Sequence, residues 1–223
     1  MKKINDNSLN RKRNNSSYNR QPGNKKPSEF ILIICEGDET EPNYFNSLRY
    51  QLKLPTVNIQ IIKKAGAPKN IIEKAKEAST NQNKDPKLKK SCPHGFDSIW
   101  CVFDRENPNN NLTFNKAVED ADANNFKLAI SNPSFEFWYI LHFRETTRQF
   151  MGGQEAKKYL AENFIPNYNE SLDVFNLLFA NTQVAITASK KILQNHPVKG
   201  ERFPNPSTTV HELVEKLIIM SIH

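Results

Sequence analysis

Two short apolar runs, each followed at once by carboxylates, constrain the fold of this chain more than any other feature. The first run covers 30–35 and ends at Glu36, and the second covers 99–103 and ends at Asp104 and Glu106. Apolar, β-branched runs of this length, bounded by turn residues, predict strands that are buried on both faces. Such strands belong to parallel sheets covered by helices, so we expect an α/β fold.

The position of these carboxylates indicates a ligand site. In open α/β sheets, ligands bind at the carboxyl ends of the strands. Asp104 and Glu106 are two residues apart in an extended segment and point to the same side, and two neighbouring oxygen ligands suit Mg²⁺ or Mn²⁺. Glu36 faces this pair if the two strands are neighbours. A solvated acidic turn before a helix would explain Glu36 alone, but not why a second strand ends in the same way.

Further strands and helices complete the expected fold. We predict a mostly parallel four-stranded sheet flanked by helices, with the remaining strands at 57–62 and 126–131. Periodic apolar residues predict helices at 42–53, 70–78, 114–124, 154–163, 174–180, 185–193 and 210–219. The expected organisation is a tail at 1–29, an α/β domain at 30–145, and a helical extension at 146–223 packed on the same domain.

The N-terminal tail carries most of the positive charge of the chain. Residues 1–29 hold eight of the 31 Lys and Arg residues but only two of the 24 Asp and Glu residues. The tail is poor in apolar residues and is expected to be disordered. A mobile basic arm can contact nucleic-acid phosphates through charge alone, and Arg11, Lys12 and Arg13 are the candidate contacts. A tail that only keeps the protein in solution is an equal alternative.

Several functional classes are disfavoured by what the sequence lacks. No apolar run approaches the ~20 residues of a membrane-spanning helix, and the N-terminus has no apolar segment typical of a secretory signal. Cys35 and Cys101 lie in predicted buried strands, and we expect the three cysteines to be reduced thiols of a cytoplasmic protein. There is also no phosphate-binding glycine loop, no dinucleotide-binding glycine motif and no Ser-His-Asp arrangement.

Two further carboxylates are candidate metal ligands, each with a structural alternative. Glu41 lies in the first turn of a predicted helix, where negative charge also stabilises the helix dipole. Glu136 opens an aromatic helix, and burying it unpaired among apolar side chains would be costly. It is therefore a metal ligand or an orienting group, or else it caps the helix. Ser131 and Asn132, at the end of the strand predicted at 126–131, are candidates to position a substrate phosphate or a metal-bound water. Arg105, directly after Asp104, is a further candidate to bind substrate.

Carboxylates repel phosphates, so an acidic site of this kind acts on nucleic acids only through a metal ion. Such an ion polarises a phosphoryl oxygen and activates water. Glu36 could then accept a proton from the nucleophile or return one to the leaving oxygen. The residues therefore point to metal-dependent phosphodiester cleavage with Glu36 as the catalytic residue. The candidate ligands for the Mg²⁺ or Mn²⁺ ion are Glu36, Glu41, Asp104, Glu106 and Glu136.

Three sequence blocks, taken together, resemble the RloB-like family, a bacterial family with a Toprim-like fold. The blocks are Glu-Gly-x-x-Thr-Glu-Pro-x-Tyr-Phe at 36–45, Trp-x-Val-Phe-Asp-Arg at 100–105, and Ser-Asn-Pro-x-Phe-Glu-x-Trp at 131–138 with Leu-His-Phe at 141–143. The resemblance implies that Glu36 is a general acid/base and that Asp104 and Glu106 hold the metal. Most Toprim proteins have Asp at the second position of this pair, where this chain has Glu106.

The resemblance also implies a biological setting. It suggests a nuclease effector of an anti-phage defence system, held inactive by a partner ATPase of the AAA or ABC type. Related effectors cut RNA, including tRNA, or DNA, and the sequence does not choose between these substrates. A non-catalytic adaptor that binds the ATPase is the competing class, and Glu106 slightly favours it. A phosphatase acting on small nucleotides is a third alternative.

Overall fold

The computed structural model describes residues 29–56, 59–81, 92, 94–105, 111–196 and 200–222. Its centre is a five-stranded sheet with the strand order β2-β1-β3-β4-β5. The strands are β1 (Ile31–Cys35), β2 (Ile59–Ile62), β3 (Ser98–Asp104), β4 (Lys127–Asn132) and β5 (Ser207–Thr208). All four strands predicted from the sequence are present and pair in parallel. The predicted tail lies outside the described residues, except for Glu29.

The prediction of a mostly parallel four-stranded sheet is wrong in one respect, because the sheet is mixed and has a fifth strand. Strand β5 pairs with β4 in the antiparallel direction, with Ser131 opposite Thr208 and Asn132 opposite Ser207. It is only two residues long and follows a proline-containing loop. A segment this short has no measurable alternation of apolar and polar residues. The C-terminal part of the chain therefore completes the sheet as well as supplying helices.

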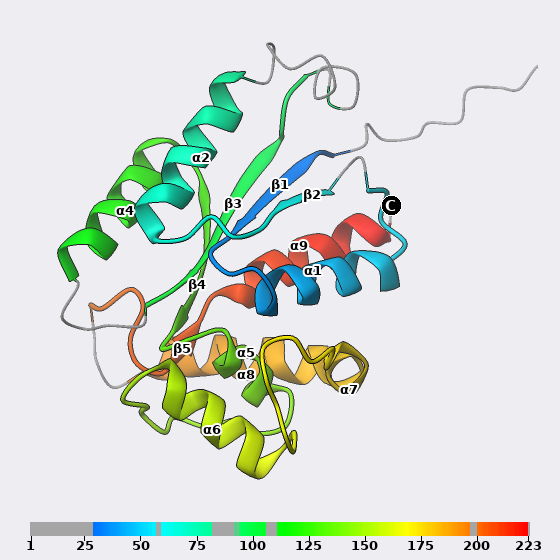
Figure 1. Ribbon diagram of the computed structural model, residues 1–223, viewed down its shortest axis with the longest axis vertical. Helices are drawn as coiled ribbons and strands as arrows, with labels where there is room; N and C mark the ends of the chain where they lie inside the picture. Colours follow the sequence, from blue (N-terminus) through cyan, green and yellow to red (C-terminus); the bar gives the residue numbers. More distant parts are fainter. Residues whose placement is uncertain are drawn as a thin grey trace, which may run out of the picture.

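Helices cover both faces of the sheet. Figure 1 shows α2 (Pro68–Asn81) and α4 (Asn111–Ala123) on one face, and α1 (Thr40–Gln51) and α9 (Val210–Ser221) on the other. The remaining helices gather beyond the β4–β5 edge. They are α5 (Glu136–Leu141), α6 (Gly153–Asn163), α7 (Phe175–Leu178), the 3-10 turn η2 (Phe179–Asn181) and α8 (Thr182–Asn195). None of the helices in these ranges has the length and apolar character needed to cross a bilayer.

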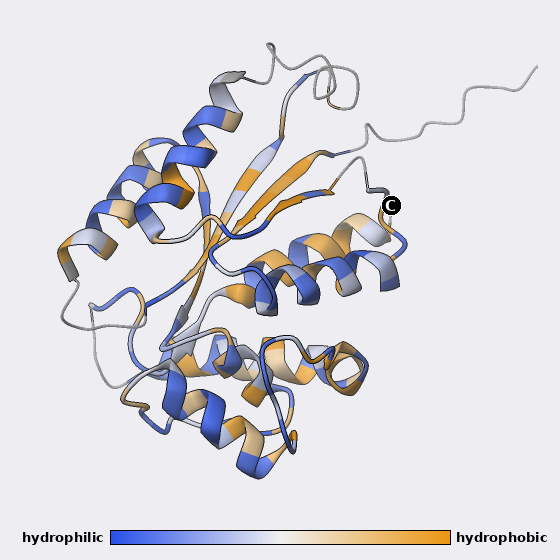
Figure 2. Ribbon diagram, viewed as in Figure 1, coloured by the Kyte–Doolittle hydropathy of each residue, from blue (hydrophilic) through white to orange (hydrophobic). Residues whose placement is uncertain are grey.

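Alternate residues of β1 supply two separate cores. Ile31, Ile33 and Cys35 pack with apolar side chains from α1, α5, α8 and α9. Leu32 and Ile34 pack on the opposite face with side chains from α2 and α4. This alternation explains why the run at 30–35 is apolar throughout, since a strand covered on both faces has no solvent side. In Figure 2, β1 and β2 are strongly hydrophobic and the helices beside them are of mixed character.

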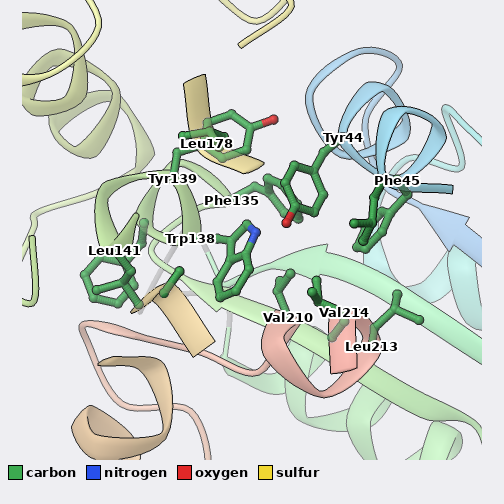
Figure 3. Packing of buried hydrophobic residues seen from close by; sticks show 14 of the residues in the cluster. Tyr44, Phe45, Phe135, Trp138, Tyr139, Leu141, Leu178, Val210, Leu213 and Val214 are labelled. Carbon is green, nitrogen blue, oxygen red and sulfur yellow. The ribbon is translucent and has the colours of Figure 1, made fainter. Parts of the chain in front are cut away.

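The first of these cores is unusually rich in aromatic rings. Tyr44 of α1 meets Phe135 and Trp138 edge to face, at ring-centroid distances of 5.7 Å and 6.2 Å. Figure 3 shows these rings between α1, α5 and the side chains of Val210 and Val214 on α9. The short helix α5 is therefore fixed against α1, and Tyr139 strengthens this contact by donating a hydrogen bond to the Thr40 carbonyl at 3.2 Å.

Candidate functional site

The carboxyl ends of β1 and β3 are joined directly by the side chain of Glu36. Its backbone N–H donates to the carbonyl of Val102 at 3.0 Å, which continues the β1–β3 ladder by one residue. Its carboxylate oxygen Oε2 accepts the backbone N–H of Asp104 at 3.0 Å. The two acidic strand ends expected from the sequence therefore lie side by side. This contact also fixes the position of one carboxylate oxygen of Glu36.

A cavity of about 300 Å³ opens at this edge of the sheet. It is bounded by the ends of β1 and β3, the first turns of α1 and α5, the helix α6 and the loop after it. Its lining is strongly acidic and includes Glu36, Asp38, Glu39, Glu41, Asp104, Glu136 and Glu170. Lys157 is the single basic side chain among the described residues that line it. Four of the five predicted metal ligands thus share one cavity.

Glu41 is buried beneath this cavity in the first turn of α1. Its side chain is 5% exposed, and its oxygen Oε1 accepts the backbone N–H of Gly37 at 3.4 Å. The glycine at position 37 leaves room for this carboxylate, since a Cβ atom there would lie 2.5 Å from Oε2 of Glu41 and would displace it. Burial raises the pKa of Glu41 to about 7, and repulsion from the carboxylates of Glu36 and Glu136 acts in the same direction.

Glu136 is held by two hydroxyl groups. Ser134 donates to Oε2 at 2.6 Å, and Tyr168, from the loop after α6, donates to Oε1 at 3.2 Å. Phe135 is the N-cap residue of α5, and no side chain caps this helix. Glu136 follows in the first turn, is 4% exposed and lines the cavity. Ser134 and Tyr168 therefore orient the Glu136 carboxylate, and Glu136 does not cap the helix. Its role as a metal ligand stays a prediction.

The raised pKa of Glu41 gives a testable pH dependence of stability. Because the folded protein holds this proton up to about pH 7 while the unfolded chain releases it near pH 4.5, unfolding becomes easier as pH rises through this window. We expect metal-free wild type to lose about 2–3 kcal/mol more stability than Glu41→Gln between pH 5 and pH 8. Urea denaturation in the presence of a chelator measures this difference. Equal losses in the two proteins would show that Glu41 ionises normally.

The three predicted substrate-binding residues do not line this cavity. Arg105 forms an ion pair with Glu201 and donates to the Phe203 carbonyl at 2.7 Å. Asn132 donates to the same carbonyl at 2.8 Å. The hydroxyl of Ser131 shares a hydrogen bond with the hydroxyl of Thr208 at 3.0 Å. All three side chains therefore hold the segment at 200–208 against the strand ends, and their role in substrate binding stays a prediction.

The remaining predicted residues fall outside the described part of the chain. These are Glu106, the second member of the acidic pair, and the tail residues Arg11, Lys12 and Arg13. Conversely, sequence reasoning missed Lys157, Tyr168 and Glu170. They belong to α6 and the loop after it, and no motif connects that segment to the strand ends. Sequence reasoning also missed Ser134, although its position two residues before Glu136 is a local signal that could have indicated it.

The chemistry of the donor set fits a hard divalent cation. Carboxylate oxygens are the ligands that Mg²⁺ and Mn²⁺ prefer. The hydrogen-bond donors to Glu41 and Glu136 described above are neutral. A nearby cation would favour the charged form of Glu41, whose pKa is raised by burial and by repulsion from Glu36 and Glu136. Within the ranges that the structure describes, no three His, Cys, Asp or Glu side chains are gathered into a ready coordination shell.

Comparison with known proteins gives one result for this chain. The sequence model of a protein family described as RloB-like protein matches residues 31–217. This range begins at β1 and ends within α9, and it includes every described residue of the acidic cavity. No curated protein and no solved structure matches the chain.

Proposed function

This chain belongs to the RloB-like family, and from that membership and its acidic cavity we propose that it is a Toprim-like nuclease. The proposed reaction is hydrolysis of phosphodiester bonds in nucleic acid with Mg²⁺ or Mn²⁺. One observation carries the proposal: the hydrogen bond of 3.0 Å from the Asp104 backbone to the Glu36 carboxylate. It brings together two acidic strand ends that are 68 residues apart in the sequence.

The Toprim-like fold is proposed from the arrangement of the first four strands. They are parallel in the order β2-β1-β3-β4, with Glu36 at the end of β1 and Asp104 at the end of β3. The antiparallel strand β5 is an addition at the β4 edge. In parallel sheets, the carboxyl ends of adjacent strands form one ligand-binding edge. This edge is where the acidic cavity opens.

The residues that would hold the ion are Glu36, Asp104, Glu41 and Glu136, together with Glu106 from outside the described ranges. When bound, the ion polarises a phosphoryl oxygen and lowers the pKa of water. The protein positions its carboxylates around that ion. The Asp104 backbone fixes Glu36, and the hydroxyls of Ser134 and Tyr168 fix Glu136. Fixed ligands need no rearrangement when charge develops in the transition state.

Glu36 is the proposed proton carrier. A carboxylate in reach of the attacking water can accept its proton and later return one to the leaving oxygen. Oxygen Oε2 of Glu36 accepts the Asp104 N–H, which holds this carboxylate at the edge of the cavity. Glu41 stays buried and supplies charge to the ion instead of exchanging protons with substrate.

The biological setting is proposed from the family alone. RloB-like proteins resemble partners of AAA- or ABC-type ATPases in defence against phage. We therefore propose a cytoplasmic effector whose cleavage of RNA, tRNA or DNA is controlled by such an ATPase. The tail residues Arg11, Lys12 and Arg13 are the proposed electrostatic contacts to nucleic-acid phosphates.

A catalytically inactive adaptor that binds the ATPase is the alternative function. Two observations favour it: Glu106 replaces the usual Asp, and the described carboxylates are not gathered into a coordination shell. Incubation of the purified protein with tRNA, single-stranded RNA and DNA separates the two functions. We expect cleavage with Mg²⁺ or Mn²⁺ that stops when a chelator is added. A protein that stays inert with both ions, even with its ATPase partner present, would favour the adaptor.

A further inference from the structure

Lys157 lies opposite the carboxylates of the acidic cavity. It projects from α6 and lines the cavity together with Gln154 and Gly153, while Glu36 and Asp104 line it from the sheet. Its ammonium forms an ion pair with Glu170. The side chain of Lys157 is 22% exposed and that of Glu170 is 55% exposed. The lysine side chain is therefore mostly buried, whereas the side chain of its partner is exposed to solvent.

The two sides of the cavity differ in charge. The strand ends and the first turns of α1 and α5 present Glu36, Asp104, Glu41 and Glu136, which repel a phosphate unless a cation lies between them. On the α6 side, Lys157 is neutralised by Glu170, and it can attract a phosphate once Glu170 moves away. A phosphodiester has two non-bridging oxygens, which point in different directions from the tetrahedral phosphorus. It can therefore face the cation with one oxygen and an ammonium group with the other.

We propose that Lys157 is the residue that binds the substrate phosphate, and that Glu170 occupies it as an internal competitor when substrate is absent. Binding requires Lys157 to exchange the Glu170 carboxylate for a non-bridging phosphate oxygen. This inference rests on the proposed function, because it assigns a phosphodiester to the same cavity.

The exchange is energetically easy in this setting. An ion pair with a solvent-exposed partner contributes little, because water screens it and both side chains lose freedom to form it. The contact of a mostly buried ammonium with a phosphate anion is a stronger, charge-assisted hydrogen bond. Glu170 therefore weakens substrate binding without abolishing it. The two residues should have opposite effects on binding although they are partners in one ion pair.

The opposite effects distinguish this proposal from a purely structural ion pair. We would measure binding of fluorescein-labelled single-stranded 12-nucleotide DNA and RNA by fluorescence anisotropy, with Ca²⁺ replacing Mg²⁺ to slow turnover. Lys157→Gln should weaken binding about 10-fold, through loss of a charge-assisted bond. Glu170→Gln should tighten binding about 3-fold, through release of a weak competitor. When Lys157 is already replaced by glutamine, Glu170→Gln should change binding no more than the control substitution Glu162→Gln does.

Matched controls lie on the same helix. Lys158 and Glu162 form an exposed ion pair on α6 and do not line the cavity. Lys158→Gln and Glu162→Gln make the same charge changes, so their effects measure the general influence of net charge. Both should change binding by less than about twofold. Lys157→Arg keeps the charge and should retain most of the binding. It tests the role of the positive charge even if Lys157→Gln proves poorly folded by circular dichroism.

The outcomes separate this inference from the proposed function. Lys157→Gln binding like Lys158→Gln, a wild type that binds neither oligonucleotide, or weaker binding by Glu170→Gln would each overturn the role of Lys157. Cleavage that depends on Glu36 would still support the nuclease in those cases. Conversely, the expected opposite shifts in binding without any cleavage in Mg²⁺ or Mn²⁺ would support the phosphate contact and count against the nuclease.

Discussion

Replacement of Glu36 by glutamine should lower the rate of phosphodiester hydrolysis by about 10²–10⁴-fold, the usual contribution of a general acid–base group. Glutamine keeps the shape of the side chain, and its carbonyl oxygen can still accept the Asp104 N–H that the structure records at 3.0 Å. The variant should therefore fold normally but lack a group that exchanges protons. The measurement is the initial cleavage rate at saturating Mg²⁺ or Mn²⁺, with circular dichroism to confirm folding.

Asp38→Asn is the matched control for this experiment. Asp38 lies two residues after Glu36 in the same loop, and its carboxylate pairs with Lys63 at 3.0 Å and with Lys64 at 3.5 Å. Because this exposed charge is already balanced by two lysines, its removal should leave the rate within about twofold. If both variants cleave at the wild-type rate, the assignment of Glu36 as the proton carrier is wrong.

Replacement of Trp138 by alanine should destabilise the protein by about 3–5 kcal/mol, as large-to-small changes of buried aromatic residues do. Trp138 is fully buried and lies edge to face with Tyr44 and with His142, whose ring centroid is 4.8 Å away. Figure 3 shows its indole beside Val210 of α9. Its removal leaves a cavity where α1, α5 and α9 meet. A loss of this size is a large part of the ~5–15 kcal/mol stability of a typical domain.

Denaturation in urea measures this loss, and Tyr50→Ala is its control. Tyr50 is also aromatic, but it is 84% exposed at the end of α1, so its removal should change stability by less than about 0.5 kcal/mol. Because α5 carries Glu136, we also expect Trp138→Ala to reduce the stabilisation gained on adding Mg²⁺. A Trp138→Ala protein as stable as Tyr50→Ala would mean that the aromatic core does not hold α5 in place.

Most of the sheet could be predicted from the sequence because its strands are covered on both faces. The runs at 30–35, 99–103 and 126–131 each contain several consecutive apolar residues, and the observed strands agree within two residues at each end. Helix α1 begins at Thr40, two residues before the predicted start at Pro42. Strand β5 was missed because two residues carry no periodic pattern. Its position depends on tertiary contacts with β4, which sequence does not specify locally.

The candidate site could be predicted only in part, for a related reason. Glu36 and Asp104 were found because carboxylates directly after apolar strands are visible as a local pattern. Lys157 and Glu170 reach the same cavity from a helix and a loop whose own sequence shows only a surface pattern. Arg105 occupies the expected strand end, but the segment at 200–208 covers that end and engages its side chain. The path of that segment could not be inferred from the residues near Arg105.

The central claim is that carboxylates from distant parts of the chain form one divalent-cation site. It is tested most directly by locating Mn²⁺ in crystals of the protein through its anomalous scattering. We expect an ion within about 2.6 Å of carboxylate oxygens of Glu36 or Asp104, and its loss in crystals of Glu36→Gln. The account would be contradicted by ordered wild-type crystals in which Mn²⁺, at concentrations that saturate cleavage, is absent from this cavity or binds elsewhere.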